Sequence, residues 1–383
     1  MMTNKIPLLT VSNEMTVDEI SQILWTAIKY EASDILIDYG YRVRIDVNGT
    51  IHEITDKHMQ PNACKNILLY MLGSKSSLLN KVNSAEPVFF AHVTKNPKDK
   101  TLIRSFRIAA LTSRSLIYGK TFKMVGRLNP DTPRNALQLN IEQELVDIVQ
   151  NSRKGIALFV GGTGTGKTTT MAGIITTVLE TPSNGKHILV FEDPPEISYE
   201  KVDKAVGNSI SVHEVGPIET DSDVLSFGSG LRTALRLRPN ILVQGELRSK
   251  ESIEYALNFS NTGHFLLATL HSNSCQSAIS RIFNMIDGED KAAVLGSFIN
   301  ELSTIVAQIL VRTIGGGRIA LRETIYLDSD LRTELLSAKS DIEIGRIIHR
   351  YLSDRNQTFA QQLKDLYDNG IIAPESLMME EQV

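Results

Sequence analysis

The sequence has few cysteines and no long apolar run, and both absences narrow the class of protein. Its 383 residues include two cysteines, Cys64 and Cys275, which are far apart and form no Cys-x-x-Cys pair. A disulfide framework and a cysteine-rich zinc site are therefore disfavoured, and we expect a reducing cytoplasm. No run approaches the roughly 20 apolar residues of a membrane span, and the first residues lack the apolar core of a signal peptide. We expect membrane association only through partner proteins.

A strong charge bias is also absent. The chain carries 40 Lys and Arg against 44 Asp and Glu, for a formal net charge of −4. Because nucleic-acid binding depends on positive charge, we expect no stable nucleic-acid binding. The hydrophobic content of 42% is ordinary for a globular protein, and the length is sufficient for two domains with sizeable cores.

Residues 161–169 carry the strongest functional pattern. Gly161-Gly-Thr-Gly-Thr-Gly-Lys-Thr-Thr fits G-x-x-x-x-G-K-T, after an apolar strand pattern at Gly155–Val160 and before a helical pattern at Thr168–Glu180. Strand, loop and helix in this order are the context of a phosphate-binding loop, whose glycines let backbone N–H groups surround a phosphate. The alternative is a glycine-rich turn that happens to end in Lys-Thr, and both flanks disfavour it.

This loop predicts that the protein binds ATP with Mg²⁺. Lys167 is expected to reach the β- and γ-phosphates, and the Thr168 hydroxyl to bind Mg²⁺. The residues expected to hold the nucleotide are Gly161, Gly162, Thr163, Gly164, Thr165, Gly166, Lys167, Thr168 and Thr169.

Two further strand patterns end in carboxylates. Val190-Phe-Glu192-Asp-Pro-Pro-Glu places acids directly after a strand, where one of them can orient or deprotonate the attacking water or hold Mg²⁺ through waters. The alternative is an acidic turn that closes the strand.

Asn240–Val243 leads to Glu246 at the Walker B position, and we expect Glu246 to coordinate Mg²⁺ through water, with a share of base character. Arg248 stabilises phosphate charge or a subunit contact, or is a surface arginine.

Histidine and arginine side chains complete the candidate set. His271 follows the apolar segment His264–Thr269 and is a candidate sensor of the γ-phosphate, although a lone histidine is more often structural. Positions 264 and 271 point to opposite faces of a strand, so a shared metal site is not expected. Arg107, Arg114 and Arg127 lie in strand patterns before the loop. They are candidate arginine fingers across a subunit boundary, or parts of a solvated basic face.

The periodicity predicts two domains of different class. Residues 1–130 read as an α+β domain that begins with a helix at Thr16–Lys29, capped by Thr16 and Glu19, and contains an Asn48-Gly49 hairpin turn. Residues 131–139 read as a linker, and residues 140–383 as an α/β domain with a mostly parallel sheet and a helical end. The strands expected in its sheet are Gly155–Val160, His187–Phe191, Asn240–Val243, His264–Thr269 and Arg318–Tyr326.

Together these motifs resemble the PilT-like ATPases of type II and type IV secretion and of pilus motors. The resemblance rests on the phosphate loop, Phe191-Glu-Asp-Pro-Pro-Glu, Ile241-Leu-Val-Gln-Gly-Glu-Leu-Arg and Thr262-Gly-His-Phe-Leu-Leu-Ala-Thr-Leu-His, in the family's order. Gly317-Arg-Ile-Ala-Leu-Arg-Glu resembles the DotB and TraJ branch, which serves type IVB secretion and IncI-type conjugative transfer. Leu36 stands where the family often has His, Ser249 where it has Asp, and no tetracysteine zinc region is present.

The resemblance implies a cytoplasmic homohexamer that acts at the inner-membrane base of the apparatus through partner proteins. It implies a PAS-like N-terminal domain and a RecA-like P-loop ATPase domain. It also implies that Glu192 is the catalytic glutamate, Glu246 the Walker B glutamate and His271 a phosphate contact. The arginines offered across subunits are Arg107, Arg114 and Arg127. A pilus-retraction motor, a DNA-translocating ring and a non-catalytic nucleotide-binding scaffold remain alternatives.

Overall fold

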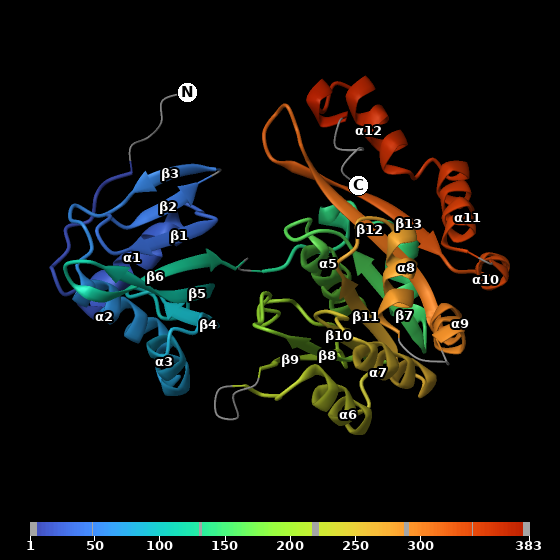
Figure 1. Ribbon diagram of the computed structural model, residues 1–383, viewed down its shortest axis with the longest axis horizontal. Coiled ribbons are helices and arrows are strands. Elements are labelled where there is room, and N and C mark those ends of the chain that lie inside the picture. The colour runs from blue at the N-terminus through green and yellow to red at the C-terminus, as the bar shows by residue number, and fades with distance from the viewer. Residues whose placement is uncertain are drawn as a thin grey trace. The chain divides into compact units, whose positions relative to one another are not determined.

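Two compact units make up the protein in a computed structural model that describes residues 6–47, 49–129, 132–216, 222–286, 291–338 and 340–377. As far as these residues are described, unit 1 contains Met1–Thr132, Pro194–Ser198 and Gly216–Asp223, and unit 2 contains the remainder (Figure 1). The hairpin residue Asn48 lies outside the described residues. Among those described, none of the helices combines the length and the apolar character needed to cross a bilayer.

Unit 1 is an antiparallel sheet of six strands with three helices. The strand order is β3-β2-β1-β6-β5-β4. Burial alternates along β4, so one face of the sheet packs on the core and the other does not. The elements are α1 (Val17–Lys29), β1 (Asp34–Asp38), β2 (Arg44–Val47), β3 (Thr50–Glu53), α2 (Pro61–Leu72), α3 (Ser76–Asn83), β4 (Val88–Lys95), β5 (Ile103–Ser115) and β6 (Gly119–Leu128).

The predicted cap of the first helix is confirmed. The Thr16 hydroxyl accepts from the Glu19 N–H, and the Glu19 carboxylate accepts from the Thr16 N–H at 2.6 Å. Backbone hydrogen bonding from Thr16 lowers the pKa of Glu19 from the usual 4.5 to about 2. Because the folded pKa is depressed, this contribution to stability is complete above pH 4.5 and is lost as the pH falls toward 2.

Thr16→Ala is expected to lower the free energy of unfolding of unit 1 by about 1 kcal/mol, because the cap hydroxyl is lost. The only tryptophan of the chain, Trp25, lies in α1, so its fluorescence during denaturant unfolding reports on this unit. Thr26→Ala, on the same helix, is the matched control and should not destabilise, because alanine favours a helix interior. Equal losses in both variants would contradict the capping role.

Unit 2 is a sheet of seven strands in the order β13-β12-β7-β11-β10-β8-β9, with helices packed around it (Figure 1). All neighbouring strands pair in parallel except β12 with β13, which confirms the prediction of a mostly parallel sheet. The strands are β7 (Gly155–Val160), β8 (His187–Glu192), β9 (Ser209–Glu214), β10 (Ile241–Gln244), β11 (Phe265–Leu270), β12 (Leu302–Arg312) and β13 (Arg318–Tyr326). The helices are η1 (Leu137–Leu139), α4 (Gln143–Asn151), α5 (Lys167–Glu180), α6 (Phe227–Leu237), α7 (Lys250–Asn261), α8 (Cys275–Met285), α9 (Lys291–Glu301), α10 (Ser329–Ser337), α11 (Asp341–Asp354) and α12 (Phe359–Asp368).

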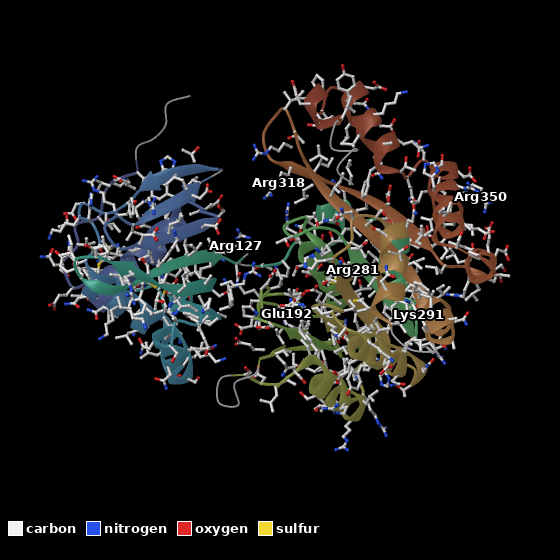
Figure 2. The ribbon with its side chains drawn as sticks, in the orientation of Figure 1. Arg127, Glu192, Arg281, Lys291, Arg318 and Arg350 are labelled. Carbon is white, nitrogen blue, oxygen red and sulfur yellow. The ribbon has the colours of Figure 1, made fainter. Side chains whose placement is uncertain are left out.

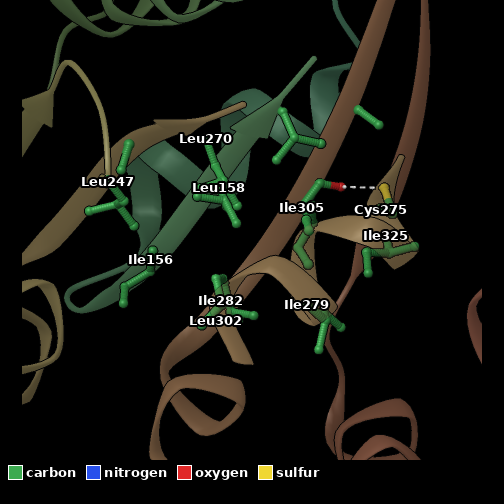
Figure 3. Close-up of a cluster of buried hydrophobic side chains, with 14 of the residues drawn as sticks. Ile156, Leu158, Leu247, Leu270, Cys275, Ile279, Ile282, Leu302, Ile305 and Ile325 are labelled. Atoms are coloured by element: carbon green, nitrogen blue, oxygen red, sulfur yellow. Dashed lines mark hydrogen bonds between the residues drawn. The ribbon is translucent and has the colours of Figure 1, made fainter. Parts of the chain in front are cut away.

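The central strands of this sheet are buried on both faces, which explains their continuous apolar sequences. All six residues of β7 are buried. On one face, Leu158 of β7 and Ile305 of β12 belong to the same core as Ile279 of α8 (Figure 3). The Cys275 thiol of α8 is buried there and lies 3.6 Å from the Ile305 carbonyl oxygen, to which it donates. The sequence analysis does not predict β12, because an apolar run alone does not separate a buried strand from a buried helix. It does not predict β9 either, a short strand of mixed polar and apolar residues at the edge of the sheet.

Candidate functional site

The four predicted motifs lie at one edge of the sheet of unit 2. β7, β11, β10 and β8 are adjacent and parallel, so their carboxyl ends meet there. The phosphate loop follows β7, His271 follows β11, Glu246 comes two residues after β10, and Glu192 is the last residue of β8. Hydrogen bonds tie these ends together: the Gly245 N–H donates to the Phe191 carbonyl at 3.0 Å, and the Leu247 N–H to the Thr269 carbonyl at 2.9 Å.

Glycine is required at two positions of the loop. Gly161 has a φ of 151°, and a Cβ there would lie 2.6 Å from the carbonyl oxygen of Gln308. Gly166 has a φ of 88°, precedes α5 as its N-cap, and a Cβ there would lie 2.9 Å from Nε2 of Gln308. The loop can therefore pack closely on β12 and still present its N–H groups to a phosphate at the start of α5.

Lys167 is almost completely buried at the first position of α5. Its ammonium donates to the carbonyl oxygens of Gly161 and Gly162, each at 2.8 Å. Burial lowers the pKa of Lys167, and the negative charge of Glu246 partly opposes that shift. The ammonium is thus held over the loop by two neutral acceptors, which a phosphate can replace with a stronger, charge-assisted contact.

Glu246, Arg248 and His271 form one cluster beside the loop. Nε of Arg248 donates to one carboxylate oxygen of Glu246 at 2.6 Å, and Nε2 of His271 lies 3.6 Å from the other. The Glu246 side chain is 13% exposed, whereas that of Arg248 is 70% exposed. Burial raises the pKa of Asp193, and Arg248 opposes this rise. Glu246 and Asp193 thus place two acids at adjacent strand ends beside one exposed guanidinium.

Glu192 is the most buried acid of the predicted set, at 7% exposure. It lies in unit 2 (Figure 2). The pKa of the buried Tyr199 is raised by burial first and by the charge of Glu192 second. The Glu192 carboxylate at the carboxyl end of β8 is the candidate acceptor for a proton.

A cavity of about 580 Å³ opens on the other side of the loop, toward β12 and β13. Arg318, at the start of β13, is one of its two lining arginines (Figure 2). The lining residues are Gly161, Gly162, Thr163, Gly164, Thr165, Asn273, Gln308, Ile309, Leu310, Arg312, Arg318, Glu375 and Ser376. The loop therefore has acids on its β11 side and a roomy, cationic cavity on its β12 side.

The donor set fits a magnesium ion that is bound together with phosphate. Within the described residues, no group of three or more His, Cys, Asp and Glu side chains is arranged to hold a metal by itself. Magnesium commonly takes only one or two protein ligands and completes its shell with water and phosphate oxygens. The Thr168 hydroxyl in the first turn of α5 and the Glu246 carboxylate are the groups available for this purpose.

The three arginines predicted to act across a subunit boundary are not all brought together. Arg107 of β5 and Arg127 of β6 are direct partners in the strand register. Arg107 pairs with Glu196, whose segment belongs to unit 1, and Nε of Arg127 donates to Asp34 at 3.0 Å. Arg114 is exposed near the other end of β5, opposite Lys120.

Sequence reasoning missed several residues that contact or line the loop. Gln308 donates to the Thr165 carbonyl, and Arg312 and Arg318 line the cavity. The available signal was Gln308 itself, a polar residue in the middle of the apolar segment Ile305–Val311.

Comparison with known proteins finds relatives across the whole chain. The model of the family described as type II/IV secretion system protein matches residues 10–320. The type IV pilus ATPase PilU of Pseudomonas aeruginosa is 29% identical over 94% of this chain and 88% of its own. The ATPase DotB of Yersinia pseudotuberculosis superimposes with a TM-score of 0.81 at 26% identity, over 100% of both chains. The pilus retraction motor PilT with bound ADP gives a TM-score of 0.78 at 26% identity, over 94% of this chain and 96% of that one.

Proposed function

Because the chain belongs to the type II/IV secretion system protein family, we propose that it is an ATPase that hydrolyses ATP to ADP and phosphate to power a secretion or transfer apparatus. The observation that carries the proposal is the meeting of the phosphate loop, Glu246, His271 and Glu192 at one sheet edge. The names of similar proteins support it, since PilU and DotB are both described as ATPases.

Each loop residue has a role in this proposal. The N–H groups of residues 161–169 surround the phosphates, and Lys167 leaves the carbonyls of Gly161 and Gly162 to bind the β- and γ-phosphates. Thr168 and Glu246 hold Mg²⁺, which neutralises charge on the phosphates when bound. The nucleoside occupies the cavity on the β12 side of the loop, where Arg312 and Arg318 lie.

Glu192 is the principal base in this proposal. It accepts a proton from a water that attacks the γ-phosphorus in line, while the bond from that phosphorus to the β–γ bridging oxygen breaks. Glu246 is assigned to Mg²⁺ in this proposal rather than to the transfer of the proton. His271 contacts the γ-phosphate from the next strand end, and the proton leaves Glu192 to solvent after phosphate departs.

We propose a homohexamer in which Arg107, Arg114 and Arg127 contact nucleotide bound by a neighbouring subunit. Similarity of the fold to DotB and PilT supports this. The register pairing of Arg107 and Arg127 supports it for these two arginines, whereas Arg114 lies near the other end of β5. Residues 1–130 form the PAS-like domain, residues 131–139 the linker and residues 140–383 the RecA-like domain. The ring is cytoplasmic and reaches the inner membrane through proteins of the apparatus.

Type IVB secretion or plasmid conjugative transfer is the proposed task. The similarity in structure to DotB and the Gly317-Arg-Ile-Ala-Leu-Arg-Glu segment support it. The second candidate is pilus retraction, which the similarity to the pilus retraction motor PilT over 94% of the chain favours. Deletion of the gene should abolish transfer of substrate or plasmid DNA and leave surface motility intact, and a Lys167→Ala gene should not restore transfer. Loss of twitching with intact transfer would support the retraction motor instead.

A DNA-translocating ring would predict that DNA stimulates the turnover of ATP. With the net charge of −4, we expect single- or double-stranded DNA to change the rate of ATP turnover by less than about twofold. Phosphate release is measured with and without DNA at low salt, where electrostatic binding is strongest. Stimulation of tenfold or more would favour a DNA translocase.

A further inference from the structure

Gln308 connects the phosphate loop to the rest of unit 2. It lies in the middle of β12 and is 2% exposed. Its Nε2 donates to the Thr165 carbonyl in the loop at 2.6 Å. Its Oε1 accepts from the Thr170 hydroxyl at 2.7 Å and from Nε of Arg322 at 3.0 Å. One buried amide therefore contacts the loop, the first turn of α5 and the neighbouring strand β13.

These partners fix the orientation of the amide. The Thr165 carbonyl can only accept a hydrogen bond and the Arg322 guanidinium can only donate, so a flipped amide would lose both contacts. The loop is also packed directly on Gln308, since Gly161 and Gly166 leave no room for a Cβ against it. A shift of the Thr165 peptide must therefore move Gln308 or break its hydrogen bond.

Arg322 carries the connection away from the loop. It is 6% exposed, and its guanidinium donates to the carbonyl of Asn140 at 2.9 Å and to that of Leu139 at 3.2 Å. Leu139 ends η1, and Asn140 follows with a left-handed φ of 49°. This turn belongs to the segment through which the chain enters unit 2 after Thr132. Gln308 and Arg322 thus join the loop to that segment, across about 140 to 180 residues of sequence.

We propose that Gln308 is a positioning residue that holds the phosphate loop in its binding conformation, and that Arg322 transmits the state of the loop to the 139–140 turn. This rests on the proposed function and identifies how the same site is regulated. When Lys167 exchanges the Gly161 and Gly162 carbonyls for a phosphate, the loop tightens on Gln308. The guanidinium of Arg322 then restrains the Leu139 and Asn140 peptides. Nucleotide binding thereby restrains the backbone where the chain leaves unit 2 toward unit 1.

Two substitutions in the full-length protein separate the two halves of this link. Gln308→Glu keeps the size of the side chain and an acceptor for Arg322, but places an oxygen against the Thr165 carbonyl. Arg322→Lys keeps the charge and loses the fork that reaches Leu139 and Asn140. Glu323→Gln is the matched control, because Glu323 is a buried polar neighbour on β13 that accepts instead from the Phe359 N–H of α12.

The readouts are affinity for a fluorescent ATP analogue, kcat and KM for ATP, and hydrogen exchange of residues 135–141 with and without nucleotide. In the wild type, nucleotide should slow exchange in this segment. Gln308→Glu should raise Kd and KM for the nucleotide about tenfold. In this variant, saturating nucleotide should no longer slow hydrogen exchange of residues 135–141. Arg322→Lys should keep Kd within about threefold and also abolish the slowing. Glu323→Gln should behave as the wild type in both respects.

Thermal unfolding of each variant shows whether it is folded, and Gln308→Met serves as the second variant if Gln308→Glu is not. The proposal is overturned if either Gln308 variant binds nucleotide with wild-type affinity, or if Arg322→Lys retains the nucleotide-dependent slowing. Either of those results leaves the proposed function intact as long as the wild type hydrolyses ATP. Absence of ATP binding by the wild type would instead remove the proposed function itself.

Discussion

Lys167→Ala is expected to reduce ATP turnover by about 10²–10³ or more, because it removes a preorganised donor from phosphates whose charge grows in the transition state. Lys167 is nearly buried and is aimed into the loop by two hydrogen bonds of 2.8 Å. Its removal should also weaken nucleotide binding, since a charge-assisted contact to the phosphates is lost. Phosphate release at saturating Mg-ATP and binding of a fluorescent nucleotide measure the two effects.

Lys154→Ala is the matched control for this substitution. Lys154 belongs to the same unit, and its ammonium pairs with Glu301 at 2.9 Å on the surface. Because its side chain is 56% exposed, its loss should cost little stability and leave turnover unchanged. If Lys167→Ala retained full turnover while folded, the loop at 161–169 would not be the active site.

Glu192→Gln is expected to lower the rate of turnover by about 10²–10⁴ while nucleotide binding is kept, because the amide cannot accept the proton of the attacking water. The substitution is isosteric, and Glu192 lies at the end of β8 rather than in the loop. Single-turnover phosphate release and equilibrium binding separate the chemical step from binding.

Glu246→Gln is the companion to this experiment. It should lower the rate and also raise the Mg²⁺ concentration needed for half-maximal turnover, since Glu246 is the proposed metal ligand. An unchanged rate in Glu192→Gln together with a large loss in Glu246→Gln would move the role of base to Glu246. Comparable losses of rate with unequal effects on Mg²⁺ affinity would agree with the division of roles proposed above.

Much of the site could be predicted from sequence because its parts are local. Each strand pattern runs directly into the loop, the acid or the histidine that follows it, and parallel strands bring those ends to one edge. The helix cap at Thr16 and Glu19 is equally local, since its partners are three residues apart. In these cases one short stretch of sequence contains both the strand or helix and the functional or capping residue next to it.

The missed residues depend on contacts between distant parts of the chain. Gln308 acts on a loop that lies more than 140 residues earlier, through a strand that had not been predicted. Arg322 belongs to the segment Gly317-Arg-Ile-Ala-Leu-Arg-Glu that carries the resemblance, but its buried contacts with Leu139 and Asn140 have no sequence pattern of their own. The pairing of Arg107 with Arg127 likewise depends on the register of β5 and β6, which periodicity does not fix.

The most direct test of the central claim is the release of phosphate by the purified full-length wild type mixed with Mg-ATP. We expect many turnovers per chain, with phosphate and ADP formed in equal amounts. We also expect this turnover to require both the phosphate loop and Glu192. Tight binding of ATP, with no phosphate released in excess of the Lys167→Ala protein measured in parallel, would contradict the account and identify a nucleotide-binding scaffold.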